Sequence, residues 1–473
     1  MSSLSLLHPI NPQFKPPSKP PRQLAGRKSS IPAIRSSLAP PPQLGFSDPF
    51  VLDLAETLED SLSPSTLSPL RRIREASSER LLSTPWPSRK DEAFRFTDTS
   101  FLRSSSIYPA PRPSVEGGEF GLGDLGIVDG YVVSSCRDFS EGVVVGSLAE
   151  VGSGTICERI LELVSDFEWG DLFWSVNGVG APDLGIVYVP SGCQVENPIR
   201  LRYFCAEGGD GESGKLAISN PRVFVLVEKG GEVDIVEEFV DAEEGKCCWV
   251  NTALEIVISE GGKVRHSYVQ NQSLSSAHIK WTSVRQESES SYQLVEVSTG
   301  GRLSRHNLHV QQLGPNTQTE LSTLHLAVGE QTQDLHSRLV LDHPRGYSRQ
   351  LHKCIVAHSQ GQVVFDGNIK VNRCAQQTDA GQLTRSLLLE PRATVNVKPN
   401  LQIIADDVKC SHGAAISDLE ESQLFYLQAR GIDLKTARKA LVFSFGAEVI
   451  SQLPDALTQK KVEKQIRDLL DPR

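Results

Sequence analysis

Short runs of alternating or apolar residues, separated by glycine or polar turns, fill the middle of the chain from about residue 125 to about residue 415. Alternation with a period of two predicts β-strands, whose side chains point in turn to opposite faces. Strands repeated over such a length predict a large sandwich, a propeller or a β-solenoid. No WD-type blade signature and no strict repeat is visible, so we favour the solenoid and leave the other two open. The clearest runs are 185–189, 223–227, 253–258, 294–297, 362–366 and 394–397.

Helical patterns precede this β-rich stretch. Asp48 is suited to cap a helix that has Pro49 in its first position, and Ser68 with Pro69 repeats the same start signal. Within the β-rich stretch itself, one further helix can form near 156–166.

Helical periodicity returns after the last strand pattern. Ser417 with Glu420 resembles a capping box, Gly431 is a helix stop signal, and Asp433 can cap the helix that follows. Helices are expected at the end of a solenoid, because an open β edge invites aggregation. We therefore divide the chain into a leader at 1–46, an N-terminal helical region at 47–124, a β core at 125–415 and a C-terminal helical region at 416–473.

The leader has a composition unlike the rest of the chain. Residues 1–46 contain no Asp or Glu, but they hold six basic residues, eight serines and ten prolines. A basic, serine-rich and acid-free leader is typical of a transit peptide, and its low ratio of Arg to Ser favours the plastid over the mitochondrion. We therefore predict import into the chloroplast stroma and a disordered leader, with a Pro-rich tail as the alternative.

Charge and cysteine content exclude several classes of protein. The chain carries a net charge of −10, and the acidic excess lies outside the basic leader, which argues against nucleic acid as a partner. No apolar run is long enough to span a membrane. The nine cysteines are irregularly spaced and form no Cys-x-x-Cys, which indicates a reducing compartment and opposes a disulfide framework or a self-contained zinc site.

Three patterns resemble catalytic motifs and fail on closer reading. Residues 209–215 match Gly-x4-Gly-Lys, but Leu216 stands where a P-loop needs Ser or Thr, and a strand pattern follows instead of a helix. Nine of the eleven histidines lie between 266 and 358, where alternating polar positions of a long sheet explain them better than a metal shell does. Asp406 and Asp407 are adjacent and would point apart on a strand, so a carbohydrate-cleaving solenoid has little support.

Cys410 and His412 are the most informative candidates. They end a short β-rich run and stand two residues apart, so on a strand both side chains project from one face. A thiolate and an imidazole on one face suit zinc, copper or iron–sulfur chemistry. Two donors do not complete a site, so further ligands would have to come from elsewhere in this chain or from another chain. A thiol packed in the core beside a surface imidazole explains the spacing equally well.

Four segments in the last third of the chain form a long and specific pattern. They are Phe-Asp-Gly-Asn-Ile-Lys-Val at 365–371, Ala-Gln-Gln-Thr-Asp-Ala-Gly-Gln at 375–382, Ala-Asp-Asp-Val-Lys-Cys-Ser-His-Gly-Ala at 405–414 and Gln-Leu-Phe-Tyr-Leu-Gln-Ala-Arg-Gly-Ile at 423–432. Weaker matches lie upstream, at 94–98 and 220–222. In these segments the chain resembles the SufB/SufD family of iron–sulfur assembly proteins. It has the SufD form, because Ser411, His412, Gly413 and Ala414 stand where SufB-like chains carry Glu-His-Glu-Ala.

This resemblance implies a right-handed parallel β-helix core with helical N- and C-terminal regions. It implies a scaffold subunit that pairs with a SufB-like paralogue through the β-helix and docks a SufC-like ABC ATPase on its C-terminal helices. His412, with Cys410 beside it, would be a candidate ligand of iron or of a nascent cluster shared with SufB, and the chain would hold no cofactor alone. The residues implied for SufC docking are Leu424, Phe425, Tyr426, Arg430, Ala437, Leu441 and Phe445.

Two other functions stay open beside the ligand-bearing scaffold. The chain can be a purely structural subunit that holds its partners while SufB carries all the chemistry. A β-helix enzyme acting on carbohydrate is the weaker alternative.

Overall fold

The computed structural model describes residues 48–62, 68–113, 120–121, 124–135, 142–151, 154–164, 167, 169–209, 214–241 and 247–470. The predicted transit peptide at 1–46 lies outside the described residues, as does most of the P-loop-like segment.

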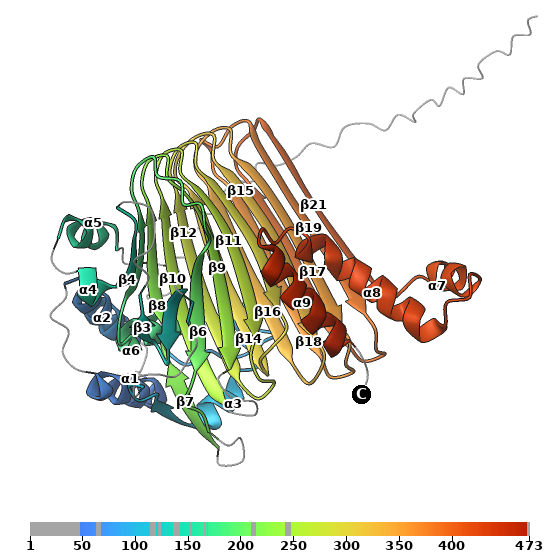
Figure 1. Ribbon diagram of the computed structural model, residues 1–473, viewed down its shortest axis with the longest axis horizontal. Helices are drawn as coiled ribbons and strands as arrows, with labels where there is room; N and C mark the ends of the chain where they lie inside the picture. Colours follow the sequence, from blue (N-terminus) through green and yellow to red (C-terminus); the bar gives the residue numbers. More distant parts are fainter. Residues whose placement is uncertain are drawn as a thin grey trace, which may run out of the picture. The chain divides into compact units, whose positions relative to one another are not determined.

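Two long, mainly parallel sheets form the core of the described chain, and only the pairs β2–β3 and β4–β5 are antiparallel among its named strands (Figure 1). From β8 onward the chain alternates between the sheets, so each pair of strands completes one coil of a solenoid. The first sheet contains β1 (Ser106–Pro109), β4 (Val144–Ser147), β5 (Gly185–Val189), β7 (Lys215–Ser219), β8 (Arg222–Val227), β10 (Cys248–Ile258), β12 (Ala277–Gln286), β14 (Leu303–Gln312), β16 (Thr332–Leu341), β18 (Gln362–Val371) and β20 (Thr394–Ile403). The second contains β2 (Asp124–Val128), β3 (Tyr131–Ser134), β6 (Ile199–Cys205), β9 (Glu232–Asp241), β11 (Lys263–Asn271), β13 (Ser291–Ser298), β15 (Gln318–Ala327), β17 (Tyr347–Val356), β19 (Thr378–Leu388) and β21 (Val408–Ser417).

The predicted mainly β fold with a parallel β-helix core is therefore confirmed, and the sandwich and the propeller are excluded. Successive coils keep a register in which Ser291 pairs with Gln318 and Tyr347 pairs with Asp379. The same turn recurs along one side with a left-handed backbone conformation. Two glycines occupy it in the early coils, but ordinary residues such as Asn316 do so in the later ones. In the turns that lead from β8, β10, β12, β14, β16 and β18 into the second sheet, the left-handed residues are Gly230, Gly261, Glu289, Asn316, Arg345 and Gln377.

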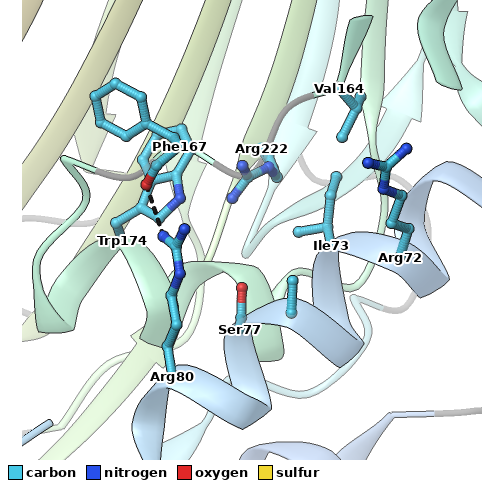
Figure 2. Close-up of a pocket in the computed structure, with 9 residues that line it drawn as sticks. Arg72, Ile73, Ser77, Arg80, Val164, Phe167, Trp174 and Arg222 are labelled. Atoms are coloured by element: carbon cyan, nitrogen blue, oxygen red, sulfur yellow. Dashed lines mark hydrogen bonds between the residues drawn. The ribbon is translucent and has the colours of Figure 1, made fainter. Parts of the chain in front are cut away.

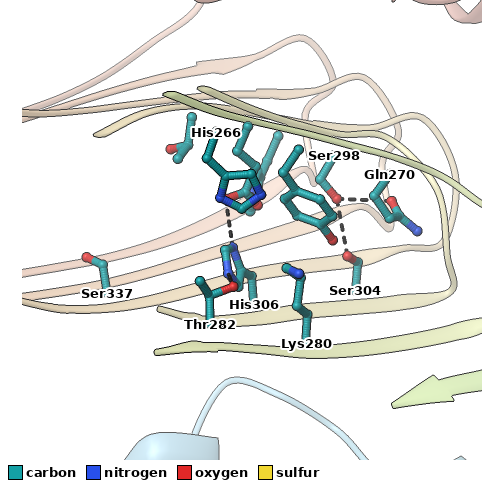
Figure 3. A network of polar contacts seen from close by, with 12 residues as sticks. His266, Gln270, Lys280, Thr282, Ser298, Ser304, His306 and Ser337 are labelled. Carbon is teal, nitrogen blue, oxygen red and sulfur yellow. Dashed lines mark hydrogen bonds and ion pairs between the residues drawn. The ribbon is translucent and has the colours of Figure 1, made fainter. Parts of the chain in front are cut away.

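The interior of the solenoid changes from apolar to polar along its length. Early coils are filled by Val, Ile and Leu side chains, whereas middle coils bury charged and hydrogen-bonding groups between the sheets (Figure 3). Lys280 Nζ lies 2.7 Å from Glu237 Oε2, and His266 Nε2 lies 2.8 Å from the same oxygen. Burial alone would raise the pKa of Glu237, but Lys280 and then His266 outweigh it and hold that pKa below its usual range.

A second buried acid sits further along the interior. Glu296 lies 2.7 Å from His306 Nδ1 and 2.8 Å from His325 Nε2. The histidine-rich stretch is thus largely a core feature. His266, His278, His306, His325 and His352 all lie buried on inward-facing strand positions, which agrees with the interpretation that they occupy alternating positions of a sheet.

The N-terminal helices pack against the early coils (Figure 1). The elements are α1 (Pro49–Ser61), α2 (Ser68–Leu81), the 3-10 turn η1 (Glu92–Phe94), α3 (Ser100–Ser104), α4 (Leu148–Val151), α5 (Thr155–Leu163) and α6 (Leu172–Gly180). The two upstream segments that match the family both take part in this packing. Thr97 Oγ1 donates to Asp334 Oδ2 of the first sheet at 2.6 Å, and Arg222 Nη1 of β8 donates to Asn177 Oδ1 of α6 at 3.0 Å.

A small cavity separates α2 from the sheet (Figure 2). Its volume of about 20 Å³ suits a single water molecule. Arg80 Nη1 closes one side by donating to the carbonyl oxygen of Phe167 at 2.6 Å. Every residue of helix α6 is buried, and sequence periodicity missed this helix because a helix buried on all sides shows no amphipathic period.

The C-terminal helices divide into a packed pair and an uncovered helix. Helices α8 (Leu434–Ile450) and α9 (Ala456–Leu469) lie against the second sheet, where Val442, Val449 and Val462 join a buried cluster with strand residues. By contrast α7 (Glu421–Gln428) has no buried residue and projects away from the strands (Figure 1).

Ion pairs add to the attachment of the packed pair. Arg200 lies 2.7 Å from Asp455, and the buried Lys353 reaches Glu448 and the carbonyl of Phe445. The predicted capping box at Ser417 and Glu420 is wrong, because Ser417 still pairs with β19 as the last residue of β21.

Candidate functional site

The solenoid ends in two neighbouring open edges. Within the described residues β20 pairs only with β18, and β21 pairs only with β19, so each of these ten-residue strands leaves one side of its backbone uncovered. Apolar side chains are exposed at the same end, with Ile404 51% and Ile416 54% accessible. Such edges pair readily with strands of another chain.

Cys410 lies on β21 and faces the interior of the last coil. Its backbone pairs with Ala380 of β19, and its half-buried side chain packs against the apolar core. Burial raises the pKa of the Cys410 thiol, so the thiol is held in its protonated form until a metal or a base removes the proton.

His412 follows two positions later on the same strand, and the predicted placement of both side chains on one face agrees with this strand. His412 is exposed, because no further coil in the described part of the chain covers β21. Its register partner on the neighbouring strand β19, one rung back along the solenoid, is the buried residue Gln382. Among the described residues no group of three or more His, Cys, Asp or Glu is arranged to hold a metal ion. Cys410 and His412 thus place one thiol and one imidazole on the same strand at this end of the solenoid.

The other sequence candidates form no catalytic arrangement with Cys410 and His412 within the described residues. Asp406 and Asp407 sit in the exposed turn between β20 and β21, not on a strand. The P-loop-like segment leads directly into strand β7 at Lys215, so the helix that a P-loop requires does not follow it. No helix of the described chain is long and apolar enough to cross a membrane.

The residues expected to dock an ATPase fall into two groups. On and just after α7, Phe425 and Tyr426 are 72% and 55% exposed, Arg430 stacks its guanidinium 3.6 Å from the Tyr426 ring, and Leu424 is half-buried. The others lie on α8 and face the solenoid. Ala437 is fully buried there, while Leu441 and Phe445 are half-buried.

One residue of this end was missed by sequence reasoning. Gln382 lies within segment 375–382, which carries part of the family resemblance. Only the strand register shows that Gln382 lies directly beside His412. A signal was available in its even spacing from Thr378 on a strand pattern, which places it on the same face.

Comparison with known proteins agrees with the resemblance found in the sequence. Residues 209–445 match the family model described as "SUF system FeS cluster assembly, SufBD core domain". The chain is 60% identical to "Protein ABCI7, chloroplastic" of Arabidopsis thaliana over 94% of this chain and 95% of that one. It is 28% identical to "Iron-sulfur cluster assembly protein SufD" of Escherichia coli, over 82% and 90% of the two chains.

A cyanobacterial relative fits the same picture. A SufBD family protein of Synechocystis is 32% identical over 83% of this chain and 89% of its own. The prediction of a chloroplast protein is confirmed by the close similarity to a chloroplastic relative. The chain belongs to the SufBD family of iron–sulfur cluster assembly proteins, and within that family it is SufD-like.

Proposed function

We propose that this protein is the non-ATPase scaffold subunit of a SufBCD-type complex that assembles iron–sulfur clusters. Its two open strand edges carry the proposal, because they lie side by side at the end that also presents Cys410 and His412. A SufB-like paralogue with a matching solenoid would continue both sheets across these edges. The site thus becomes complete only in the heterodimer.

Pairing at the open edges can be tested with a charge placed on the exposed apolar end. Ile416→Glu should weaken co-purification with the SufB-like subunit, because a carboxylate would be buried without a partner in the interface. Leu457→Glu is the matched control, since Leu457 is 70% exposed on α9, away from the edges. Equal recovery of SufB with both variants would contradict pairing at this end.

We further propose that His412 contributes a donor to the nascent cluster, with Cys410 in support. The cluster is the product that the complex builds, and the chain alone holds none. His412→Ala should leave the SufB–SufD pair intact and lower the iron and sulfide content of the anaerobically purified complex. His343→Ala, at an exposed turn, is the control. An unchanged content with His412→Ala would instead favour a purely structural subunit.

Docking of the SufC-like ATPase is assigned to α7. This helix offers exposed aromatic rings beside Arg430 and buries none of its own residues, as an unfilled protein-binding surface does. Phe425→Ser with Tyr426→Ser should abolish capture of the ATPase and leave pairing with SufB unchanged. Leu457→Ser removes a comparably exposed side chain from α9 and should retain the ATPase. Loss of capture by the α9 variant alone would place the docking surface elsewhere.

A further inference from the structure

We propose that Gln382 is a positioning residue for His412: its side-chain oxygen accepts the imidazole N–H and leaves the other ring nitrogen free to bind iron. The inference rests on the proposed ligand role of His412. The inference adds a residue of this chain that would contact the imidazole of His412 on the side away from the metal and would not itself bind the metal.

The contacts of Gln382 form a ladder across the interior. Gln382 Nε2 donates to Gln350 Oε1 at 2.8 Å, and Gln350 Nε2 donates to Ser337 Oγ at 2.6 Å. Both glutamines are buried, at 3% and 4% exposure, and Ser337 contacts Gln350 from β16 of the facing sheet. In this arrangement both amide nitrogens donate along the ladder, so Gln382 uses its nitrogen toward Gln350 and its oxygen is left for another group.

That oxygen has no hydrogen-bond partner within the described chain. Gln382 Oε1 is buried and unpaired, whereas buried carbonyl oxygens are nearly always satisfied. The next rung on the same inward face is His412, which pairs with Gln382 in the register of β19 and β21. Neighbouring strands lie about 4.8 Å apart, so an imidazole turned inward reaches this oxygen within hydrogen-bond distance.

The space for Gln382 is provided by Gly367 of the facing sheet. A Cβ atom at Gly367 would lie 2.3 Å from Gln382 Nε2, well inside contact distance. A side chain there would push the amide away from its place in the ladder. Gly367 belongs to segment 365–371, which carries part of the family resemblance, and this contact gives a physical reason for a glycine at that position.

An oxygen acceptor behind a metal-binding imidazole has two effects. It selects the tautomer whose free nitrogen faces the metal, and it makes that nitrogen more basic. Neutral Gln382 achieves this without adding a charge to the interior of the last coil. Pairing with a SufB-like strand would cover β21 and turn the exposed His412 inward, which is the step that closes the hydrogen bond.

The test compares three variants in the co-purified complex. Gln382→Leu keeps the size of the side chain and removes the acceptor. Gln382→Glu retains an acceptor, and Gly367→Ala displaces the amide without removing it. Loss of a partner behind a metal ligand typically lowers metal affinity 10–100-fold. We therefore expect a chelator to strip iron about tenfold faster from Gln382→Leu and from Gly367→Ala, and Gln382→Glu to stay closer to wild type.

Electron spin-echo envelope modulation of the reduced cluster supplies the readout that a merely structural role would not move. In wild type we expect nitrogen couplings from one imidazole, and in Gln382→Leu a shifted quadrupole coupling of the nitrogen remote from iron. Couplings and stripping rates identical in wild type and Gln382→Leu would overturn the positioning role alone. Absence of any imidazole coupling in wild type would overturn the ligand role of His412 and the positioning role together.

Discussion

The His309 side chain makes the stability of this solenoid sensitive to mild acid in a way that can be measured. Its ring lies 5.1 Å from the Phe167 ring and 5.8 Å from the Trp169 ring, and only 2% of the residue is exposed. Neither ring nitrogen has a hydrogen-bond partner within the described chain. Burial, and then the positive charge of Arg338, lower the pKa of His309 to about 4.

The sign of the pH dependence follows from this depressed pKa. In the unfolded chain the pKa of histidine is about 6.5. Between that pH and about 4, His309 is therefore protonated in the unfolded state and neutral in the folded state. The stability contributed by a neutral His309 is present above pH 6.5 and is lost as the pH falls toward 4. Between pH 7.5 and pH 5.5 the loss amounts to about 1.4 kcal/mol for this one residue.

His309→Phe isolates that loss. The variant has no titrating ring and gives up no hydrogen bond, so at pH 7.5 its stability should change by less than about 1.5 kcal/mol. Between pH 7.5 and pH 5.5 it should lose about 1.4 kcal/mol less than wild type, measured by urea unfolding followed through tryptophan fluorescence. Phe167→Leu disturbs the same aromatic contact without removing a titrating group, so its pH slope should match wild type. An unchanged slope in His309→Phe would refute the argument.

Three further substitutions probe the core and the C-terminal helices. Lys280→Met should cost about 3–5 kcal/mol in urea unfolding, because it strips Glu237 of its buried counter-charge, and adding Glu237→Gln in the same chain should recover part of the loss. Gly446→Leu should speed proteolytic removal of α8 and α9, since a Cβ at Gly446 already lies 3.1 Å from Leu324 Cδ2 of β15. Asp455→Ala should lower the midpoint of thermal unfolding through a loss of about 1 kcal/mol, because the Asp455 carboxylate caps α9.

Period-two alternation was enough to predict the β core, within which we preferred a solenoid. Local sequence signals failed to predict secondary structure where tertiary contacts determine it. Ser417 has the chemistry of a helix cap, yet it remains a strand residue because β19 offers it a backbone partner. In α6 an N-cap signal existed at Asp171, whose carboxylate accepts from Phe173 N and Trp174 N, but a helix buried on all sides shows no amphipathic period. Non-glycine residues such as Arg345 occupy left-handed turns that glycine normally marks.

Part of the candidate site could also be predicted from the sequence, and part could not. The shared face of Cys410 and His412 follows from strand geometry alone and agrees with the structure. Their neighbours do not follow, because the coils differ in length. Register partners lie 27 residues apart in one coil, as between Ser291 and Gln318, and 32 apart in another, as between Tyr347 and Asp379. An irregular repeat hides which residue forms the next rung, so the position of Gln382 beneath His412 needed the structure.

The exposure of His412 is itself a consequence of where the coils stop. Every inward residue of the middle coils is covered by a rung on either side, and that covering buries groups as polar as Glu237 and Lys280. His412 occupies the equivalent inward position on the final rung, where one side is open. Two adjacent uncovered edges with exposed isoleucines would promote aggregation if they were left free in solution. Under the proposed function, a second solenoid that continues the sheets would remove that hazard and place its own donors opposite Cys410 and His412, so one surface would both bind the partner and receive the missing ligands from it.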